Sequence, residues 1–366
     1  MVRYINLILL IIDSFYIMIT REYRPKTLKE IEVKKILKQK HINFVDAFLY
    51  QVKELFLIKN PKYTGPQKEK AYKTKEYKDF FKKIENQYVY IYYPWNFSII
   101  KTVKKENFLE LKTNRNRDLI TKDEQEKLRN VKVAVFGMSV GSNISLVLTQ
   151  AGISNDIVIG DFDKLDTTNL NRIIAGVHQI GLNKTIIAAR KIYEDNPFAK
   201  VTVLLKGASK ENIEKFLKKR KIDIMIEEVD NLPFKIHSRE LALKYKVPVI
   251  MITDNGDGVN LHVERYDLGY KKIFNKEQSY WKNILSEPLS MELMGKVIME
   301  DILDGVKNID PKMLKSVEKT FKKELVSWSQ LGSAAILGGV VATVMLKKII
   351  NKESNEKYLS KKIFVL

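Results

Sequence analysis

Residues 160–172, GDFDKLDTTNLNR, constrain the fold of this chain more than any other stretch. They follow residues 157–159, a β-branched run that is typical of a buried strand. Asp161 and Asp163 are therefore expected at the carboxyl end of a strand. In a parallel α/β sheet nucleotides bind at that edge, because the loops there converge on the crevice between strands. The stretch thus predicts a ligand site on an α/β sheet.

A strand, a glycine turn and a helix are predicted just upstream of this stretch. The strand covers residues 133–136, the turn runs from Gly137 to Gly141, and the helix begins at residue 142 or 143. Such a turn presents free backbone N–H groups and the positive end of a helix dipole to an anion. Gly137, Ser139 and Gly141 are therefore candidates for phosphate binding. The Gly-x-Ser-x-Gly spacing departs from G-x-G-x-x-G, and a turn that only packs a helix on a strand is the alternative.

Further charged residues are expected near the same edge of the sheet. Lys184 opens a periodic helix, and a lysine at that position can reach a phosphate as a point charge. Asp230 ends a strand predicted at residues 222–230. Three acids at one edge repel each other without a cation, and oxygen ligands with phosphate suit Mg²⁺. The sequence therefore predicts a magnesium site there.

The N-terminal third predicts a smaller α+β module. The spacing of apolar residues over 26–57 favours two helices broken near residues 41–43. A basic stretch over 68–83 carries aromatic residues at helical spacing, which favours a helix packed on a core over a single-strand nucleic-acid surface. Residues 88–95 are rich in aromatic and β-branched residues and have a proline at position 94, which favours an edge strand. The apolar run at 7–12 is too short to span a membrane and favours a strand or short helix.

The C-terminal third predicts helices. Residues 267–327 are expected to form a mostly helical insertion. Residues 331–349 are apolar and rich in small side chains. Because this run is short for a membrane span, we expect a buried helix on the sheet.

Charge and cysteine content limit the function classes. The net charge is +20, and residues 1–130 hold 28 Lys and Arg against 16 Asp and Glu. Such a field attracts nucleic acid, anionic membrane or an acidic substrate, although charge runs are usually solvated surface, so neither nucleic acid nor membrane is the favoured partner. The chain has no cysteine, which excludes disulfides, thiolate metal sites and thioester intermediates within it. No targeting segment is recognised, so we expect a cytoplasmic protein.

The order of these features resembles the ThiF/MoeB superfamily, the ubiquitin-activating-type adenylyltransferases. The resemblance runs from about Arg115 to Glu264 and again from Gly332 to Ile350. GDFDKLDTTNLNR is similar to the family's D-x-D…S-N-L-x-R-Q, IGLNK to its I-G-x-x-K, and EEVDN to its D-x-x-D-N. Together with TNRNRDLIT, the N-terminal module and the helical insertion also resemble a bacterial ThiF-like branch.

The resemblance implies a Rossmann-like, doubly wound, mostly parallel sheet with an N-terminal α+β accessory module and a helical insertion before the last helix. We expect four parts. They are a basic accessory module over 1–112, a nucleotide-binding domain over 113–266, the insertion over 267–330, and a helix and tail over 331–366 that complete the nucleotide-binding domain.

The resemblance also implies an Mg²⁺-ATP site that adenylates a carboxylate, such as a peptide or protein C-terminus or a small acid. By resemblance, Asp161 holds the ribose, Asp163 and Asp230 hold the metal, and Asn169, Arg172 and Lys184 hold the triphosphate. Family members are usually dimers in which an Arg from the R-Y-x-R-Q motif enters the partner's site. Arg117 matches that Arg, with Arg115 as the alternative.

Several departures from the family pattern bear on activity. Ile173 replaces the glutamine after the motif Arg, Lys235 replaces the Arg after D-N, and the cysteines of many relatives are missing. The chain is therefore expected to pass an acyl-adenylate to a separate nucleophile, or to be inactive. The alternative function is a non-catalytic or redox protein that binds NAD or FAD on the same sheet.

Overall fold

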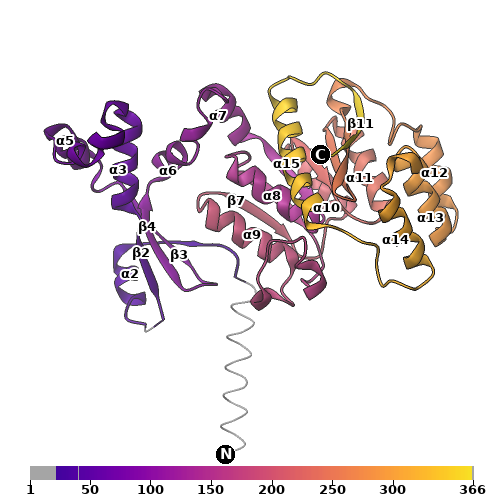
Figure 1. The fold of residues 1–366 in the computed structure, drawn as a ribbon, viewed down its shortest axis with the longest axis horizontal. Coiled ribbons are helices and arrows are strands. Elements are labelled where there is room, and N and C mark those ends of the chain that lie inside the picture. Colours follow the sequence, from indigo (N-terminus) through magenta and orange to yellow (C-terminus); the bar gives the residue numbers. More distant parts are fainter. Residues whose placement is uncertain (1–21, 40, 365–366) are drawn as a thin grey trace, which may run out of the picture. The chain divides into compact units, whose positions relative to one another are not determined.

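The computed structural model describes residues 22–39 and 41–364 (Figure 1). The strand or short helix expected at residues 7–12 lies outside the described residues. The chain divides into two compact units. Among the described residues, unit 1 holds those up to Asp123 together with Asn196–Phe198, and unit 2 holds Glu124–Asp195 and those from Ala199 onward.

Unit 1 is built on a four-stranded sheet in the order β1-β3-β4-β2. The β2–β4 pair is parallel, and the other two pairs are antiparallel. Helix α3 packs on β4 through Phe48, Val52 and Leu55 in a core that also contains Ile84. The elements are β1 Lys26–Leu28, α2 Glu30–Ile36, β2 Asn43–Asp46, α3 Phe48–Lys59, α4 Lys68–Ala71, α5 Lys75–Ile84, β3 Tyr88–Tyr93, β4 Ser98–Val103 and α6 Lys105–Lys112.

The basic stretch at 68–83 folds as the helices α4 and α5, as its periodicity predicts. The hydroxyl of Thr74 caps α5 by accepting a hydrogen bond from the backbone N–H of Tyr77 at 3.2 Å. The Tyr77 ring packs edge-on against Phe56, with 5.2 Å between ring centroids. The aromatic residues of this stretch are thus packed in the unit's own core.

Two helices were expected over 26–57 with a break near residues 41–43, and α2 and α3 lie there on either side of β2. The prediction is wrong for Phe44 and Val45, which pair with β4 in a strand instead of belonging to a helix. The strand at 88–93 was expected at a sheet edge but lies between β1 and β4. Its proline, Pro94, follows the last strand residue and so removes no ladder hydrogen bond.

Unit 2 contains a seven-stranded sheet in the order β11-β10-β9-β8-β5-β6-β7. The strands from β9 to β7 are parallel, and β10 and β11 add an antiparallel edge. The strand order reverses at β5, which has β6 on one side and β8 on the other. The strands are β5 Lys132–Phe136, β6 Asp156–Gly160, β7 Lys200–Leu204, β8 Ile224–Glu227, β9 Val249–Asn255, β10 Gly258–Glu264 and β11 Tyr358–Ile363.

Helices cover both faces of this sheet, because alternate residues of each strand point to opposite sides. Ala134 and Phe136 pack in one cluster with Ile213 of α10 and Leu241 of α11. On the other face, Gly141 of α8 lies against Val135. The fold is therefore the predicted Rossmann-like, doubly wound sheet. The helices are α7 Lys122–Asn130, α8 Val140–Gln150, α9 Lys184–Asp195, α10 Lys210–Lys218 and α11 Leu232–Tyr245.

The last helix, α15 Gly332–Ile350, packs against α8, β9 and β10. Its glycines allow a close approach: a Cβ on Gly338 would lie 2.9 Å from Ile252 Cγ2. By length and composition α15 is apolar enough to cross a membrane, and half of its most apolar window is buried in the protein. Its contacts are those expected of a buried helix on the sheet.

A group of helices precedes α15 and lies together in Figure 1. Trp281, Val297 and Ile302 of this group pack with Ile236 of α11 and Met251 of β9. The elements are α12 Gln278–Ser286, α13 Met291–Val297, a π-helix at Ile298–Ile302 and α14 Pro311–Phe321. These helices therefore pack beside the end of the sheet strand that carries Asp254.

Candidate functional site

The turn after β5 is tighter than predicted. Gly137 has φ +89° and donates its N–H to the carbonyl of Gly160 at 2.8 Å. A Cβ on Gly137 would overlap the carbonyl oxygen of Glu228. After this glycine only Met138 and Ser139 precede α8, which begins at Val140 and not at residue 142 or 143. Gly141 therefore lies in the first turn of α8, where its missing side chain lets the helix pack on Val135.

Asp161 is held by the backbone at the end of β6. Its Oδ2 accepts the N–H of Met138 at 2.6 Å, and its Oδ1 accepts the N–H of Asp163 at 2.8 Å. Burial raises the pKa of Asp161 above its ordinary value, although these two N–H groups and the Lys184 ammonium oppose the shift. The carboxylate is thus fixed in orientation beside the glycine turn.

Asp163 and Lys184 form an ion pair, with 2.8 Å between Nζ and Oδ2. The Lys184 side chain is 9% exposed, whereas that of Asp163 is 50% exposed. The N–H of Lys184 also donates to the Asp163 carbonyl at 2.9 Å. Lys184 is the first residue of α9, as predicted, and these two contacts join it to the loop after β6.

Arg172 is turned toward the glycine turn. Its Nε donates to Ser139 Oγ at 3.1 Å, and its Nη1 donates to the Thr168 carbonyl and to Asn171 Oδ1. Burial lowers the pKa of Arg172, and the charges of Asp254 and Asp230 oppose this shift. A half-buried guanidinium thus stands next to Ser139.

Asn169 is used within its own loop. Its Oδ1 accepts the N–H of Asp166 at 3.0 Å, and the residue is 8% exposed. In this structure Asn169 shapes the turn that leads to Arg172.

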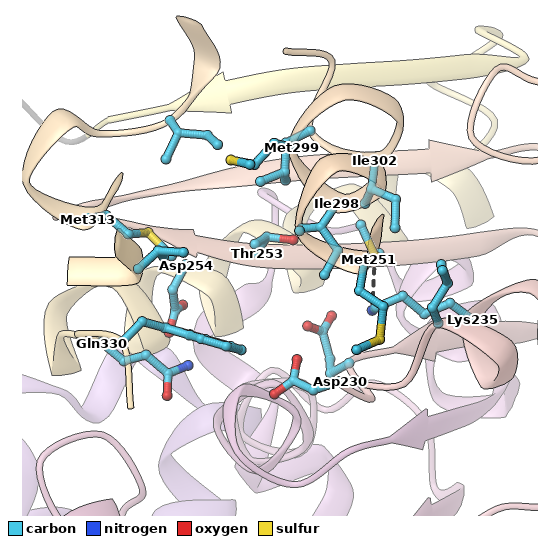
Figure 2. Close-up of a pocket in the computed structure, with 18 of the residues that line it drawn as sticks. Asp230, Lys235, Met251, Thr253, Asp254, Ile298, Met299, Ile302, Met313 and Gln330 are labelled. Carbon is cyan, nitrogen blue, oxygen red and sulfur yellow. Dashed lines mark hydrogen bonds between the residues drawn. The ribbon is translucent and has the colours of Figure 1, made fainter. Parts of the chain in front are cut away.

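Asp230 follows β8, which ends at Glu227, three residues earlier than predicted. It lines a cavity of about 300 Å³, together with Ser139, Lys235 and Asp254 (Figure 2). Asp230 is exposed at the surface, but desolvation by the surrounding protein raises its pKa, and the charge of Lys235 is the first to oppose this shift. Ser139 belongs both to this cavity and to the Arg172 contact, so the cavity adjoins the glycine turn.

Arg117 lies in unit 1, with its side chain 53% exposed and Nη2 3.5 Å from Glu110 Oε1. Six of the predicted residues lie together around the glycine turn of unit 2. They are Gly137, Ser139, Asp161, Asp163, Arg172 and Lys184. Asp230 stands near them at the cavity, and Arg117 belongs to the other unit.

The metal prediction can be tested on the donor set. Asp163 is engaged by Lys184, and Asp230 has no ion pair within 4.0 Å in the part of the chain described. No group of three or more metal-binding side chains occurs among the described residues. Mg²⁺ commonly takes one or two carboxylates and completes its shell with phosphate and water. Asp163 and Asp230 match that mode of binding in ligand type and number, and the magnesium site remains a prediction.

The sequence prediction missed Asp254, which lies near the end of β9. Asp254 is 5% exposed, and neither of its carboxylate oxygens has a hydrogen-bond partner within residues 22–39 and 41–364. Burial raises its pKa to about 6, opposed by Arg172 and reinforced by Asp230. The signal was available, because Asp254 follows the apolar run 249–252 just as Asp161 follows 157–159.

A buried ion network near the cavity was also missed. Arg239 of α11 donates to Glu227 Oε2 at 2.8 Å and also contacts Glu264, and all three side chains are at most 1% exposed. Lys235 adds a contact to Glu227 Oε2 at 3.2 Å. These charges come from α11, β8 and β10, which sequence spacing does not bring together.

Comparisons with known proteins match this domain. The ThiF family model matches residues 112–279. Uncharacterized protein MT1398 of Mycobacterium tuberculosis (strain CDC 1551 / Oshkosh) is 40% identical over 177 residues, which cover 48% of this chain and 24% of that protein. The tRNA threonylcarbamoyladenosine dehydratase of Bacillus subtilis (strain 168) is 32% identical over 139 residues, which cover 37% of this chain and 54% of that protein. The chain thus spans about a quarter and about half of these relatives.

A solved structure of E. coli tRNA N6-threonylcarbamoyladenosine dehydratase, TcdA, superposes with a TM-score of 0.47 at 18% sequence identity. The superposition covers 67% of this chain and 95% of that one.

Proposed function

We propose that this protein, whose residues 112–279 form a ThiF family domain, is an ATP-dependent adenylyltransferase that activates a carboxylate. The observation that carries the proposal is the grouping of Asp161, Lys184 and Arg172 around one glycine turn at the carboxyl ends of β5 and β6. Ligands bind at this edge of a doubly wound sheet, where the strand order reverses.

The residues of the chain have distinct roles in the proposed reaction. A carboxylate oxygen of the substrate attacks the α-phosphorus of ATP, a new P–O bond forms, and the bond to pyrophosphate breaks. The substrate carboxylate is already ionised at pH 7, so no general base is required. Arg172 and Lys184 neutralise the negative charge that develops on the phosphates, which is often the largest catalytic contribution.

Asp161 orients the nucleotide by accepting hydrogen bonds from its ribose, while its backbone contacts hold the carboxylate still. Asp163 and Asp230 are the residues that would hold Mg²⁺, which when bound supplies positive charge for the leaving pyrophosphate. Because the chain has no cysteine, the activated acyl group passes to a nucleophile outside the chain. We also expect a homodimer, with Arg117 reaching the partner's nucleotide.

Pyrophosphate exchange into ATP in the presence of candidate acids tests this function. We expect exchange with Mg²⁺-ATP, and its loss in Arg172→Ala and Asp230→Asn. Asp257→Asn is the matched control for Asp230→Asn, because Asp257 is exposed and does not line the cavity. Melting temperatures close to that of the wild type would show that the inactive variants are folded.

The alternative is a protein that binds NAD or FAD. The strand order from β7 to β9 and the acid at the end of β6 are as consistent with a dinucleotide as with ATP. Arg172 and Lys184 favour a triphosphate, because they add two cations beyond what a pyrophosphate bridge needs. Titration with ATP, NAD and FAD separates the two functions. Tight NAD binding with no ATP binding would overturn the adenylyltransferase proposal.

A further inference from the structure

The cavity next to the candidate nucleotide site has two different walls. One wall comes from the helices before α15 and is apolar, with Met294, Ile298, Met299, Ile302 and Met313. The other comes from the ends of β8 and β9 and carries Asp230 and Asp254. Figure 2 shows Met299 and Ile302 at one end of the view and Asp230 at the other.

The apolar wall suits a flexible organic group. The cavity volume of about 300 Å³ lies at the lower end of the range for small-molecule sites. Methionine side chains are unbranched and polarizable, and they adapt to ligands of varied shape. The apolar wall therefore fits the body of a small organic molecule.

Asp254 is the unusual group in the opposite wall. Buried carboxylates are normally paired or hydrogen bonded, because an isolated buried charge is costly. Both oxygens of Asp254 lack a hydrogen-bond partner among the residues that the structure describes, and the residue is 5% exposed. Arg172, the nearby cation, gives its described hydrogen bonds to Ser139, Thr168 and Asn171. Asp254 is thus available to a ligand.

The sign of the ligand charge follows from the groups around Asp254. Asp230 also lines the cavity, and Lys235, which lines it too, has its ammonium within 3.3 Å of both oxygens of Glu227. An anionic head group would therefore meet carboxylates, whereas a cationic one would pair with Asp254. A divalent metal ion is a poorer candidate for the ligand, because it would make no use of the apolar wall.

We propose that this cavity binds a primary amine with an apolar body, whose ammonium group pairs with Asp254 and whose body lies against the methionines. Binding itself does not depend on the proposed function. The role of the amine in catalysis does rest on the proposed function. A chain without cysteine needs a nucleophile from outside, and an amine can serve as that nucleophile. In that role the ammonium first releases one proton to solvent, and the neutral amine nitrogen then attacks the acyl carbon. A C–N bond forms, the bond from that carbon to AMP breaks, and the nitrogen releases a second proton to solvent.

The test uses the full chain without nucleotide and four probes. n-Octylamine, octanoate and 1-octanol share an eight-carbon chain, and n-propylamine is a shorter amine. We expect octylamine to raise the melting temperature and to give measurable heat in calorimetry, and octanoate and octanol to bind about tenfold more weakly or not at all. Asp254→Asn should lose the octylamine response, while Asp257→Asn should keep it. Ile298→Trp, at a partly exposed position of the apolar wall, should weaken octylamine but not propylamine.

Three results would overturn the proposal. Octanoate or octanol binding as tightly as octylamine would show a merely apolar cavity. Octylamine binding that Asp254→Asn leaves unchanged would place the ammonium elsewhere. A shift with Mg²⁺ alone that requires Asp254 and abolishes octylamine binding would make Asp254 a metal ligand. Because the assay contains no ATP, its failure is distinguishable from failure of pyrophosphate exchange.

Discussion

The Lys184 ammonium lies 2.8 Å from Asp163 Oδ2 and joins the first residue of α9 to the loop that follows β6. Lys184 is nearly buried while Asp163 is half exposed, so the pair has one fixed and one accessible member. Such a lysine is held in place before a phosphate arrives.

Lys184→Ala is therefore expected to lower pyrophosphate exchange by about 100-fold, the usual effect of removing one preorganised charge. Its free energy of unfolding should fall by no more than about 1 kcal/mol, since the partner is half exposed and screened by water. Lys191→Ala is the matched control, because Lys191 lies on the same helix in an exposed pair with Glu194. Equal loss of exchange in both variants would contradict the role of Lys184.

Gly137 and Gly181 allow backbone strain to be separated from steric overlap. Both have positive φ, +89° and +86°, but a Cβ on Gly181 meets nothing within 4 Å, whereas one on Gly137 overlaps the Glu228 carbonyl. Gly181→Ala should lower the free energy of unfolding by about 1–2 kcal/mol from strain alone. Gly137→Ala should lower it by roughly 3 kcal/mol or more, because overlap adds to strain. Urea denaturation measures both, and equal losses would be inconsistent with the close approach of Gly137 to Glu228.

Arg239 should be essential for stability. It is fully buried between Glu227 and Glu264, and its guanidinium carbon lies 3.9 Å from the centroid of the Phe274 ring. Arg239→Met would leave two buried carboxylates without their main partner, at a cost of about 3–5 kcal/mol. Lys244→Met on the same helix is the control and should change stability little, because its pair with Glu214 is exposed. Chemical denaturation that gave similar values for the two variants would be inconsistent with the network.

The part of the site that sequence could predict is the part built from local signals. The β-branched run before Asp161, the glycine after β5 and the periodic helix after Lys184 each fix an element over a few residues. The parallel strand order then brings their ends to one edge. The predicted fold class is confirmed, and the ThiF family model matches residues 112–279. The roles of Asp161, Asp163, Asn169, Arg172, Lys184, Asp230 and Arg117 remain predictions.

What sequence could not predict depends on long-range pairing. The three residues of β1 show no alternation that predicts a strand. Without β1 as a neighbour, β3 is predicted at the edge of the sheet. Phe44 and Val45 form β2 because β4, more than fifty residues later, supplies the partner. Likewise, the cavity exists only because the helices at 278–321 pack beside β9, which no spacing in the sequence indicates.

His262 should make the protein sensitive to acid. It is 1% exposed on β10, between Met251 of β9 and Ser360 of β11, and neither ring nitrogen has a hydrogen-bond partner among the described residues. Burial lowers its pKa to about 3, and the positive charges of Arg239 and Lys235 act in the same direction. The ring edge of Phe274 faces it without adding charge.

The sign of the effect follows from these pKa values. The unfolded chain takes up a proton at His262 near pH 6.5, whereas the folded chain stays neutral until about pH 3, so folding stability is lost as the pH falls below 6.5. At pH 5 the loss from this residue is about 2 kcal/mol, from 1.5 pH units at 1.36 kcal/mol each. His262→Leu should therefore lose about 2 kcal/mol less than wild type between pH 7.5 and pH 5 in urea denaturation. His178→Leu, at an exposed position, should keep the wild-type pH dependence, and a pH dependence unchanged in His262→Leu would show that another group controls acid stability.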